Sequence, residues 1–274
     1  MQKQSSLSSE TLIETHGLCK QFGSVKALVD LNLNIMSGEI YGLLGPNGAG
    51  KTTIIKMLTT LLPPTSGGAR VAGYDVIRQP ALVRRVIGYV PQLLSADGAL
   101  TGRENLQAFA RLYDIPRTGR ASRILSALAF MDLEGVQNKL VRTYSGGMIR
   151  RLEIAQSMLH RPRVLFLDEP TVGLDPMARH AVWERIGQLR ADYGTTVLLT
   201  THYMDEAENL CDRVAFMHMG IVTAIGTPAQ LKASIGGNGA TLDDVFDYYA
   251  GGTMEEGGSY RDTVRTRRNA RRLG

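Results

Sequence analysis

Short apolar runs alternate along the chain with segments whose apolar residues recur at helical spacing. Residues 164–167 and 196–199 are compact apolar runs, a pattern typical of central parallel strands that are buried on both faces. Residues 40–44 form another short apolar run, and residues 11–39 nearly alternate in part, which predicts strands and turns. We therefore expect an α/β fold, because strands and helices alternate along the sequence.

Helical patterns fill much of the remaining chain. Residues 53–62 predict a helix that is ended by Pro63 and Pro64, whereas residues 70–90 indicate a further strand-like stretch. From about residue 100 to residue 160 the pattern is helical.

Local signals mark two of the helix starts. Thr101 and Glu104 have the T-x-x-E spacing of a capping box, and Thr227 followed by Pro228 predicts another helix start. One predicted helix carries an apolar stripe at helical spacing, made of Met148, Leu152, Ala155 and Leu159. After Gly236 the regular pattern of apolar positions weakens, which predicts a looser, more flexible segment.

The composition is that of a globular protein, with 274 residues, 43% hydrophobic and 21% charged. No apolar run approaches the roughly 18–20 residues of a membrane-spanning helix, and no secretory signal is visible. Cys19 and Cys211 have no metal or redox spacing and are expected to be small buried hydrophobes. We therefore expect a soluble intracellular protein.

The net charge of +5 comes from one end of the chain. Residues 261–274 hold six arginines and one aspartate, so the rest of the chain is neutral overall. This distribution argues against a nucleic-acid partner, which would need a basic domain face. The tail is interpreted either as a solvated, flexible end or as a contact for anionic lipid headgroups.

Residues 45–52 fit the pattern G-x-x-x-x-G-K-[ST] between a predicted strand and a predicted helix. The glycines let successive backbone N–H groups converge on phosphate oxygens, and the helix adds the positive end of its dipole. Lys51 would reach the β- and γ-phosphates of a nucleotide, and the Thr52 hydroxyl would coordinate Mg²⁺. This loop alone leaves kinases, GTPases, helicases and transport ATPases open. The residues expected to bind nucleotide here are Gly45, Pro46, Asn47, Gly48, Ala49, Gly50, Lys51, Thr52 and Thr53.

The strand at 164–167 runs into two carboxylates, Asp168 and Glu169. Strand ends of α/β sheets face the ligand crevice, so we assign Asp168 to Mg²⁺ and Glu169 to polarising the hydrolytic water. The alternative interpretation is that Asp168 and Glu169 are ordinary surface acids that follow a core strand. GTP specificity is disfavoured, because Asn138-Lys139 is not followed by the aspartate of a guanine-reading motif.

The segment Tyr144 to Met148 resembles the signature of ATP-binding-cassette (ABC) ATPases, and its Ser145-Gly146-Gly147 core is intact. Further motifs resemble those of the family in the same order. The resemblance implies that Phe22 stacks on adenine, that Gln92 contacts nucleotide and metal, that Asp175 belongs to the D-loop and that His202 senses the γ-phosphate.

The resemblance runs from about residue 11 to residue 235 and implies a P-loop NTPase core with an antiparallel β subdomain and an inserted helical subdomain at about 95–160. Residues 236–274 would then form a C-terminal extension with a basic tail. Tyr144 and Met148 replace the commoner leucine and glutamine of the signature, so a side-chain amide contact is absent there. Together with the segments 60–67 and 242–246, that variant signature resembles the daunorubicin-resistance type of bacterial exporter ATPase.

Ser145 to Gly147 would open a helix, and this second anion site cannot fold onto the phosphate at Lys51 of the same chain. The resemblance implies a homodimer or heterodimer of nucleotide-binding domains, in which each signature caps the ATP of the other subunit. It also implies an integral membrane permease subunit as partner and a peripheral location on the cytoplasmic side of the cell membrane.

The sequence therefore predicts the ATP-hydrolysing subunit of a bacterial ABC exporter, which drives efflux of a drug-like, lipid or saccharide substrate through a separate membrane subunit. An importer ATPase shares every catalytic motif and is the first alternative. A non-transport ABC ATPase that acts on nucleic acid or ribosomes is the second.

Overall fold

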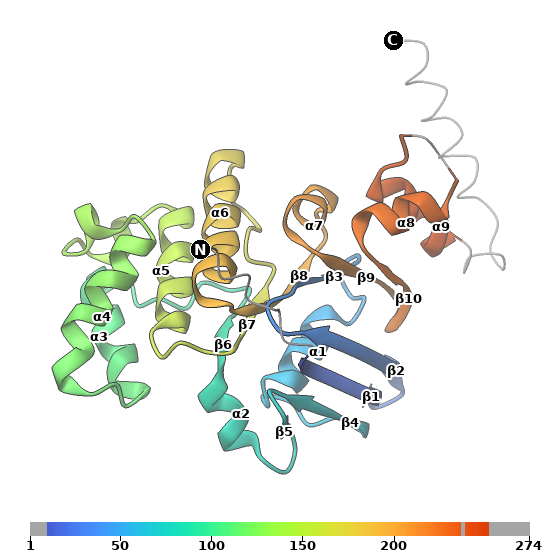
Figure 1. Cartoon of the computed structure of the whole chain (residues 1–274), viewed down its shortest axis with the longest axis horizontal. Coiled ribbons are helices and arrows are strands. Elements are labelled where there is room, and N and C mark those ends of the chain that lie inside the picture. Colours follow the sequence, from blue (N-terminus) through green and yellow to red (C-terminus); the bar gives the residue numbers. More distant parts are fainter. Residues whose placement is uncertain (1–9, 237–238, 252–274) are drawn as a thin grey trace, which may run out of the picture.

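A computed structural model describes residues 10–236 and 239–251 of the chain. Its centre is a six-stranded sheet in which the edge strand β10 (Ile221–Gly226) is antiparallel to its neighbour and the other strands are parallel (Figure 1). In spatial order the strands are β10, β9 (Arg213–His218), β3 (Ile40–Leu44), β8 (Thr196–Thr201), β7 (Val164–Asp168) and β6 (Ile87–Val90). β3, β7 and β8 are buried at every position, as expected for strands covered on both faces.

A second, antiparallel sheet is built mostly from the N-terminal part of the chain. Its order is β2 (Val25–Met36), β1 (Thr11–Phe22), β4 (Ser66–Val71) and β5 (Tyr74–Asp75). Helix α1 (Lys51–Leu58) contacts β2 and β4 of this sheet and β7 of the other, so one apolar core fills the space between the two sheets. Packing α1 there fixes the loop that precedes it.

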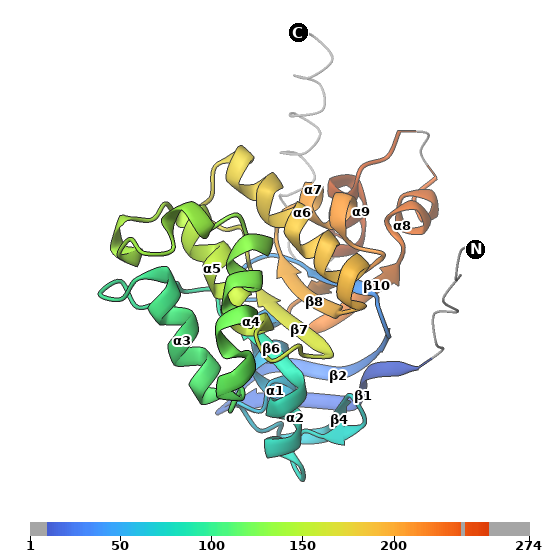
Figure 2. The same ribbon diagram turned by 60° about the vertical axis from the view of Figure 1, so that its left-hand side comes forward.

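The opposite face of the six-stranded sheet carries the other core and a layer of helices. The helices of this layer are α3 (Gly102–Leu112), α4 (Arg117–Phe130), α5 (Gly146–Met158), α6 (Pro176–Tyr193), α7 (Met204–Leu210), α8 (Pro228–Ser234) and α9 (Leu242–Gly251), with the short 3₁₀ turns η1 (Glu134–Val136) and η2 (Val141–Thr143). Helix α2 (Pro80–Val86) packs instead against β5 and β6, in the core between the two sheets. Figure 2 shows α3, α4 and α5 grouped at one end of the molecule and α8 and α9 at the other.

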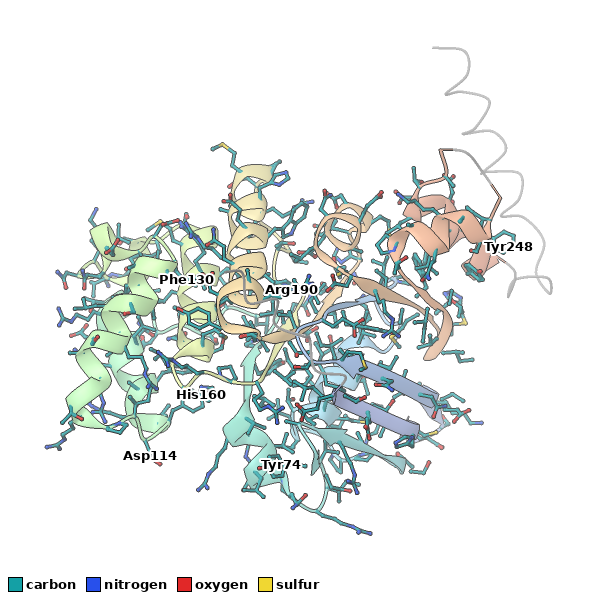
Figure 3. The ribbon with its side chains drawn as sticks, viewed as in Figure 1. Tyr74, Asp114, Phe130, His160, Arg190 and Tyr248 are labelled. Atoms are coloured by element: carbon teal, nitrogen blue, oxygen red, sulfur yellow. The ribbon has the colours of Figure 1, made fainter. Side chains whose placement is uncertain are left out.

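His160 ties the helical group to the sheet (Figure 3). Its ring stacks on Tyr113 at 3.8 Å between centroids, and its Nε2 lies 2.9 Å from the Ile87 carbonyl oxygen of β6. Burial lowers the pKa of His160, which favours the neutral ring inside the core. The residue therefore has a structural role.

Several predicted elements are confirmed. Strands lie at 40–44, 164–168 and 196–201, and the apolar stripe of α5 packs into the core. Both capping boxes are formed, at Thr101 before α3 and at Thr227 before α8.

The strand-like stretch predicted at 70–90 is right only in part, and the bounds of one predicted helix differ. The strand-like stretch at 70–90 contains helix α2, which starts at Pro80, the position where proline is favoured in a helix. The helix predicted at 53–62 runs from Lys51 to Leu58 instead, because Thr60 adopts a left-handed backbone with φ 66°.

The chain after Gly236 does not simply loosen, because residues 242–251 form helix α9. Leu242 and Val245 of this helix are fully buried in the core, and the rings of Phe216 and Phe246 lie 6.1 Å apart. The basic tail at 261–274 lies outside the described residues. Within the described ranges, no helix is long and apolar enough to cross a membrane.

Replacing Leu242 by alanine should lower the free energy of unfolding by about 2–5 kcal/mol, because it leaves a cavity under α9. The matched control is Leu112→Ala on α3, where the side chain is 75% exposed and the cost should stay within about 0.5 kcal/mol. Urea unfolding monitored by circular dichroism measures both values. Equal effects of the two variants would show that α9 is not part of the core.

Candidate nucleotide-binding site

The loop between β3 and α1 requires its glycines. Gly48 and Gly50 have φ of 83° and 101°, a region that side-chain-bearing residues rarely adopt. A Cβ at Gly45 would lie 2.3 Å from the carbonyl oxygen of Met217, and one at Gly50 would lie 2.6 Å from that of Ala27. The loop is therefore held in a wound conformation at the N-terminus of α1, where backbone N–H groups favour an anion.

Lys51 is the first residue of α1 and is only 5% exposed. Its Nζ donates hydrogen bonds to the carbonyl oxygens of Gly45 at 2.7 Å and Pro46 at 3.1 Å, and it lies 3.3 Å from Glu169 Oε1. Burial lowers the pKa of Lys51, while the negative charges of Glu169 and Asp168 oppose that change. The ammonium group thus lies inside the phosphate loop, beside two carboxylates.

Asp168 ends β7 and is bonded by two hydroxyl groups. Thr52 Oγ1 donates to Asp168 Oδ1 at 3.1 Å, and Thr200 Oγ1 donates to the same oxygen at 2.7 Å. Mg²⁺ prefers oxygen ligands and is usually held by one or two carboxylates together with substrate phosphates, so the Thr52–Asp168 pair fits this ion. In the described part of the chain, no cluster of three or more His, Cys, Asp or Glu offers an all-protein metal site.

Glu169 has an unusual backbone for a residue with a side chain. Its φ is 48°, and its backbone N–H donates to Thr200 at both the carbonyl oxygen (3.2 Å) and Oγ1 (2.9 Å). Such strained conformations cluster at functional sites, because the surrounding structure must hold them. Thr200 therefore positions both acidic residues. The sequence analysis missed Thr200, although a polar residue at the end of an apolar strand could have indicated it.

The Glu169 carboxylate brings together three other predicted residues. Gln92 Nε2 donates to Oε2 at 2.9 Å, while His202 Nδ1 lies 3.4 Å and Lys51 Nζ 3.3 Å from Oε1. The carboxylate is buried, so these three polar neighbours replace the solvation it would have in water. A carboxylate, a cation, an amide and an imidazole thus meet beside the phosphate loop.

The predicted adenine-stacking residue lies at the end of β1. Phe22 is 47% exposed, and Lys20 Nζ lies 5.1 Å from the centre of its ring. An aromatic ring this exposed has a face available for stacking.

The signature and the D-loop residue begin two helices. Ser145 Oγ accepts a hydrogen bond from the Met148 N–H at the start of α5, and Asp175 Oδ1 accepts one from the Ala178 N–H at the start of α6. A Cβ at Gly147 would lie 2.8 Å from Ala178 Cβ, so the two helix starts approach closely. Between described residues, no hydrogen bond or ion pair joins Ser145 or Asp175 to the phosphate loop or to Glu169.

The variant signature residue Tyr144 has a structural contact of its own. Its hydroxyl donates to the Val136 carbonyl oxygen at 2.7 Å, and its ring packs in the core of the helical group. The tyrosine therefore fastens the start of α5 to the turn at η1, in a position where a leucine could only pack.

Glu206 on α7 is a further residue that the sequence analysis missed. It is fully buried, and its Oε1 accepts hydrogen bonds from Thr171 Oγ1 at 2.9 Å and from Trp183 Nε1 at 2.8 Å. Burial raises the pKa of Glu206. It connects α7 and α6 with the segment that follows Glu169, whereas in the sequence it resembles an ordinary acidic residue of a first helical turn.

Comparison with known proteins agrees with this geometry. The family described as "ABC transporter" matches residues 28–172. The chain belongs to the ABC transporter family. It is an ATP-binding protein of that family, in which ATP hydrolysis is coupled to transport.

Relatives with curated names extend over most of the chain. The Daunorubicin/doxorubicin resistance ATP-binding protein DrrA of Streptomyces peucetius is 49% identical over 82% of this chain and 68% of its own length. The Nod factor export ATP-binding protein I of Ralstonia nicotianae is 41% identical over 82% of this chain and 70% of its own length. The predicted family, fold and exporter-type ATPase function are confirmed at this level.

A solved structure adds a dimer of a related cassette. The ATP-binding cassette MJ0796, described as a dimer in a post-hydrolysis state bound to ADP and Pi, superposes with a TM-score of 0.71 and 26% identity. The match covers 79% of this chain and 98% of that one.

Lys51→Ala should weaken ATP binding about 10- to 100-fold, because it removes a charge-assisted hydrogen bond to phosphate from a buried site. Lys56→Ala, on the exposed face of the same helix, is the matched control and should bind like the parent protein. Equilibrium titration with a fluorescent ATP analogue measures both. Unchanged affinity in the Lys51 variant would contradict the assignment of the phosphate loop.

Proposed function

We propose that this chain drives efflux of a drug-like, lipid or saccharide substrate through a separate integral membrane permease subunit, from the cytoplasmic side of the cell membrane. The observation that carries ATP hydrolysis in this proposal is the convergence of Lys51, Gln92 and His202 on the Glu169 carboxylate. The names of the relatives, which refer to drug resistance and to export, support the direction of transport.

In this proposal Glu169 is the base of ATP hydrolysis. Its buried carboxylate, aimed by Gln92 and His202, accepts the proton of the attacking water. Lys51 exchanges its bonds to the loop carbonyls for bonds to the β- and γ-phosphates, where its charge stabilises the negative charge that develops during the reaction.

Mg²⁺ would be held by Thr52 and Asp168, the two residues whose oxygens already lie side by side. When bound, the ion neutralises phosphate charge and orients the terminal phosphate for in-line attack. Gln92 is proposed to reach the metal as well, from its place beside Glu169. Phe22 would stack on the adenine ring.

We further propose that two nucleotide-binding domains, either two copies of this chain or this chain and a close relative, enclose ATP between them. The signature opens α5, a helix of 13 residues whose N-terminal N–H groups are suited to an anion. The dimer of the related cassette MJ0796 supports this arrangement. In it, Ser145 to Gly147 and Asp175 of one subunit would face the nucleotide held at Lys51 of the other.

Glu169→Gln keeps the shape of the side chain and removes its ability to accept a proton. Hydrolysis should fall about 100-fold or more, while ATP binding persists and an ATP-held dimer accumulates. Phosphate release and size-exclusion chromatography with ATP and Mg²⁺ measure these effects.

The matched control for this variant is Glu184→Gln, an exposed carboxyl on α6 that should leave turnover unchanged. Parent-like turnover in the Glu169 variant would remove Glu169 as the base.

A further inference from the structure

Helix α5 has an unusual second face. Besides its apolar stripe, it carries three buried polar side chains at a spacing of three residues, Arg150, Glu153 and Gln156. Buried charged residues are rare unless they are paired and hydrogen-bonded. Arg150 and Glu153 contact the segment between β6 and α3, which begins with the Gln92 loop, and Gln156 contacts Asn105 of α3.

Arg150 donates hydrogen bonds to the first residues of that segment. Its Nη1 donates to the Pro91 carbonyl oxygen at 2.7 Å, and its Nη2 donates to the Gln92 carbonyl oxygen at 2.8 Å. The planar guanidinium can bond two neighbouring carbonyls at once, which a lysine ammonium, as a point charge, does less well.

Glu153, one turn further along the helix, bonds to Arg150 and to the other end of the segment. Its Oε2 lies 3.0 Å from Arg150 Nη1, and its Oε1 accepts hydrogen bonds from the Ser95 N–H, from Ser95 Oγ at 3.1 Å and from the Ala96 N–H at 3.3 Å. Arg150 and Glu153, here termed the α5 clasp, thus hold both ends of residues 91–96 against one helix. Their side chains are 3% and 2% exposed, so the bonds form away from solvent, where they are strongest.

The attachment continues one turn further along α5. Gln156 Nε2 donates to Asn105 Oδ1 at 3.2 Å, and the same oxygen accepts the Asp97 N–H at 2.9 Å. Asn105 Nδ2 in turn donates to the Asp97 carbonyl oxygen at 3.0 Å. The segment is therefore attached to α5 at both ends, directly at Pro91, Gln92, Ser95 and Ala96 and through Asn105 of α3 at Asp97.

The clasp lies between the Gln92 side chain and the signature. At one end, the loop that it holds presents the Gln92 side chain, which donates to the Glu169 carboxylate. At the other end, the helix that carries the clasp begins with the signature, with Ser145 as its cap. In the proposed dimer these two groups serve different ATP molecules, because Gln92 acts in its own subunit's site and Ser145 caps the site of the other subunit.

We propose that Arg150 and Glu153 are positioning residues that lock the Gln92 loop to the signature helix, so that the two ATP sites of the dimer respond to nucleotide together. When ATP occupies one site, Gln92 moves, and the clasp transmits this movement to α5. The movement of α5 then places the signature, which caps the other site. This inference rests on the dimer proposed above.

The test uses the Glu169→Gln protein, in which bound ATP is not turned over. Arg150→Lys keeps the charge of the clasp but lacks the fork that bonds both loop carbonyls. The double variant Arg150→Met/Glu153→Leu removes both charges, an exchange that buried pairs often tolerate without loss of stability. Circular dichroism melting establishes that each variant is folded.

The matched control is Arg151→Lys. Arg151 is the next residue of the same helix, but it donates to the Met131 carbonyl oxygen at 2.9 Å and lies 3.5 Å from Asp132, away from the Gln92 loop. It reports the effect of losing an arginine from α5 without touching the clasp.

Two quantities are measured with ATP and Mg²⁺. The affinity of the monomer for a fluorescent ATP analogue, at protein concentrations too low for pairing, should stay within about twofold of the parent in both clasp variants, because their sites are intact. The ATP concentration at which half of the protein is dimeric in sedimentation velocity should rise about fivefold or more. The Hill coefficient should fall below the parent's value, because the clasp no longer adds to the coupling that the shared interface provides.

Clasp variants that keep the parent's Hill coefficient and half-dimer concentration overturn the inference, and so does an equal change in Arg151→Lys. Should Arg150→Lys melt early, the charge-free double variant carries the same two measurements. A Glu169→Gln parent that stays monomeric with ATP overturns the proposed dimer, and with it the inference, before any clasp residue is changed. The two failures are therefore distinguishable.

Discussion

The site depends on the polar contacts that stabilise one buried carboxylate, that of Glu169. Glu169 lies out of water, in a strained backbone conformation, and Lys51, Gln92 and His202 surround it. Each of the four residues follows a different strand, namely β3, β6, β7 and β8, which are neighbours in the central sheet. Because the carboxyl ends of parallel strands meet at one edge of a sheet, residues far apart in the sequence arrive at the same place. The charge balance of the site is thus a consequence of topology.

The parts of the fold that the sequence predicted are those that local chemistry determines. The phosphate loop, the capping boxes at Thr101 and Thr227 and the fully apolar strands all carry their signal within a few residues. Helices α2 and α9 escaped prediction, because α2 is short and α9 is stabilised by burying Leu242 and Val245 under a sheet that the sequence alone does not place.

The same limit applies to the site. Lys51, Asp168 and Glu169 stand in recognisable motifs, and the order of the motifs suggested Gln92 and His202. Buried charges such as Glu206 and Arg150 look in the sequence like any solvated helix residue, because what distinguishes them is a partner far along the chain. Predicting them would need the packing of α5, α6 and α7 beforehand.

The hydrogen bond between Trp183 and Glu206 has a practical consequence. Trp183 is the sole tryptophan of the sequence, and its indole N–H is bonded to a carboxyl that also holds Thr171, two residues after Glu169. The emission of an indole depends on the polarity and charge around its ring nitrogen. The protein therefore contains a native optical reporter linked to the segment that follows Glu169, so its fluorescence can follow rearrangements of that segment without any attached dye.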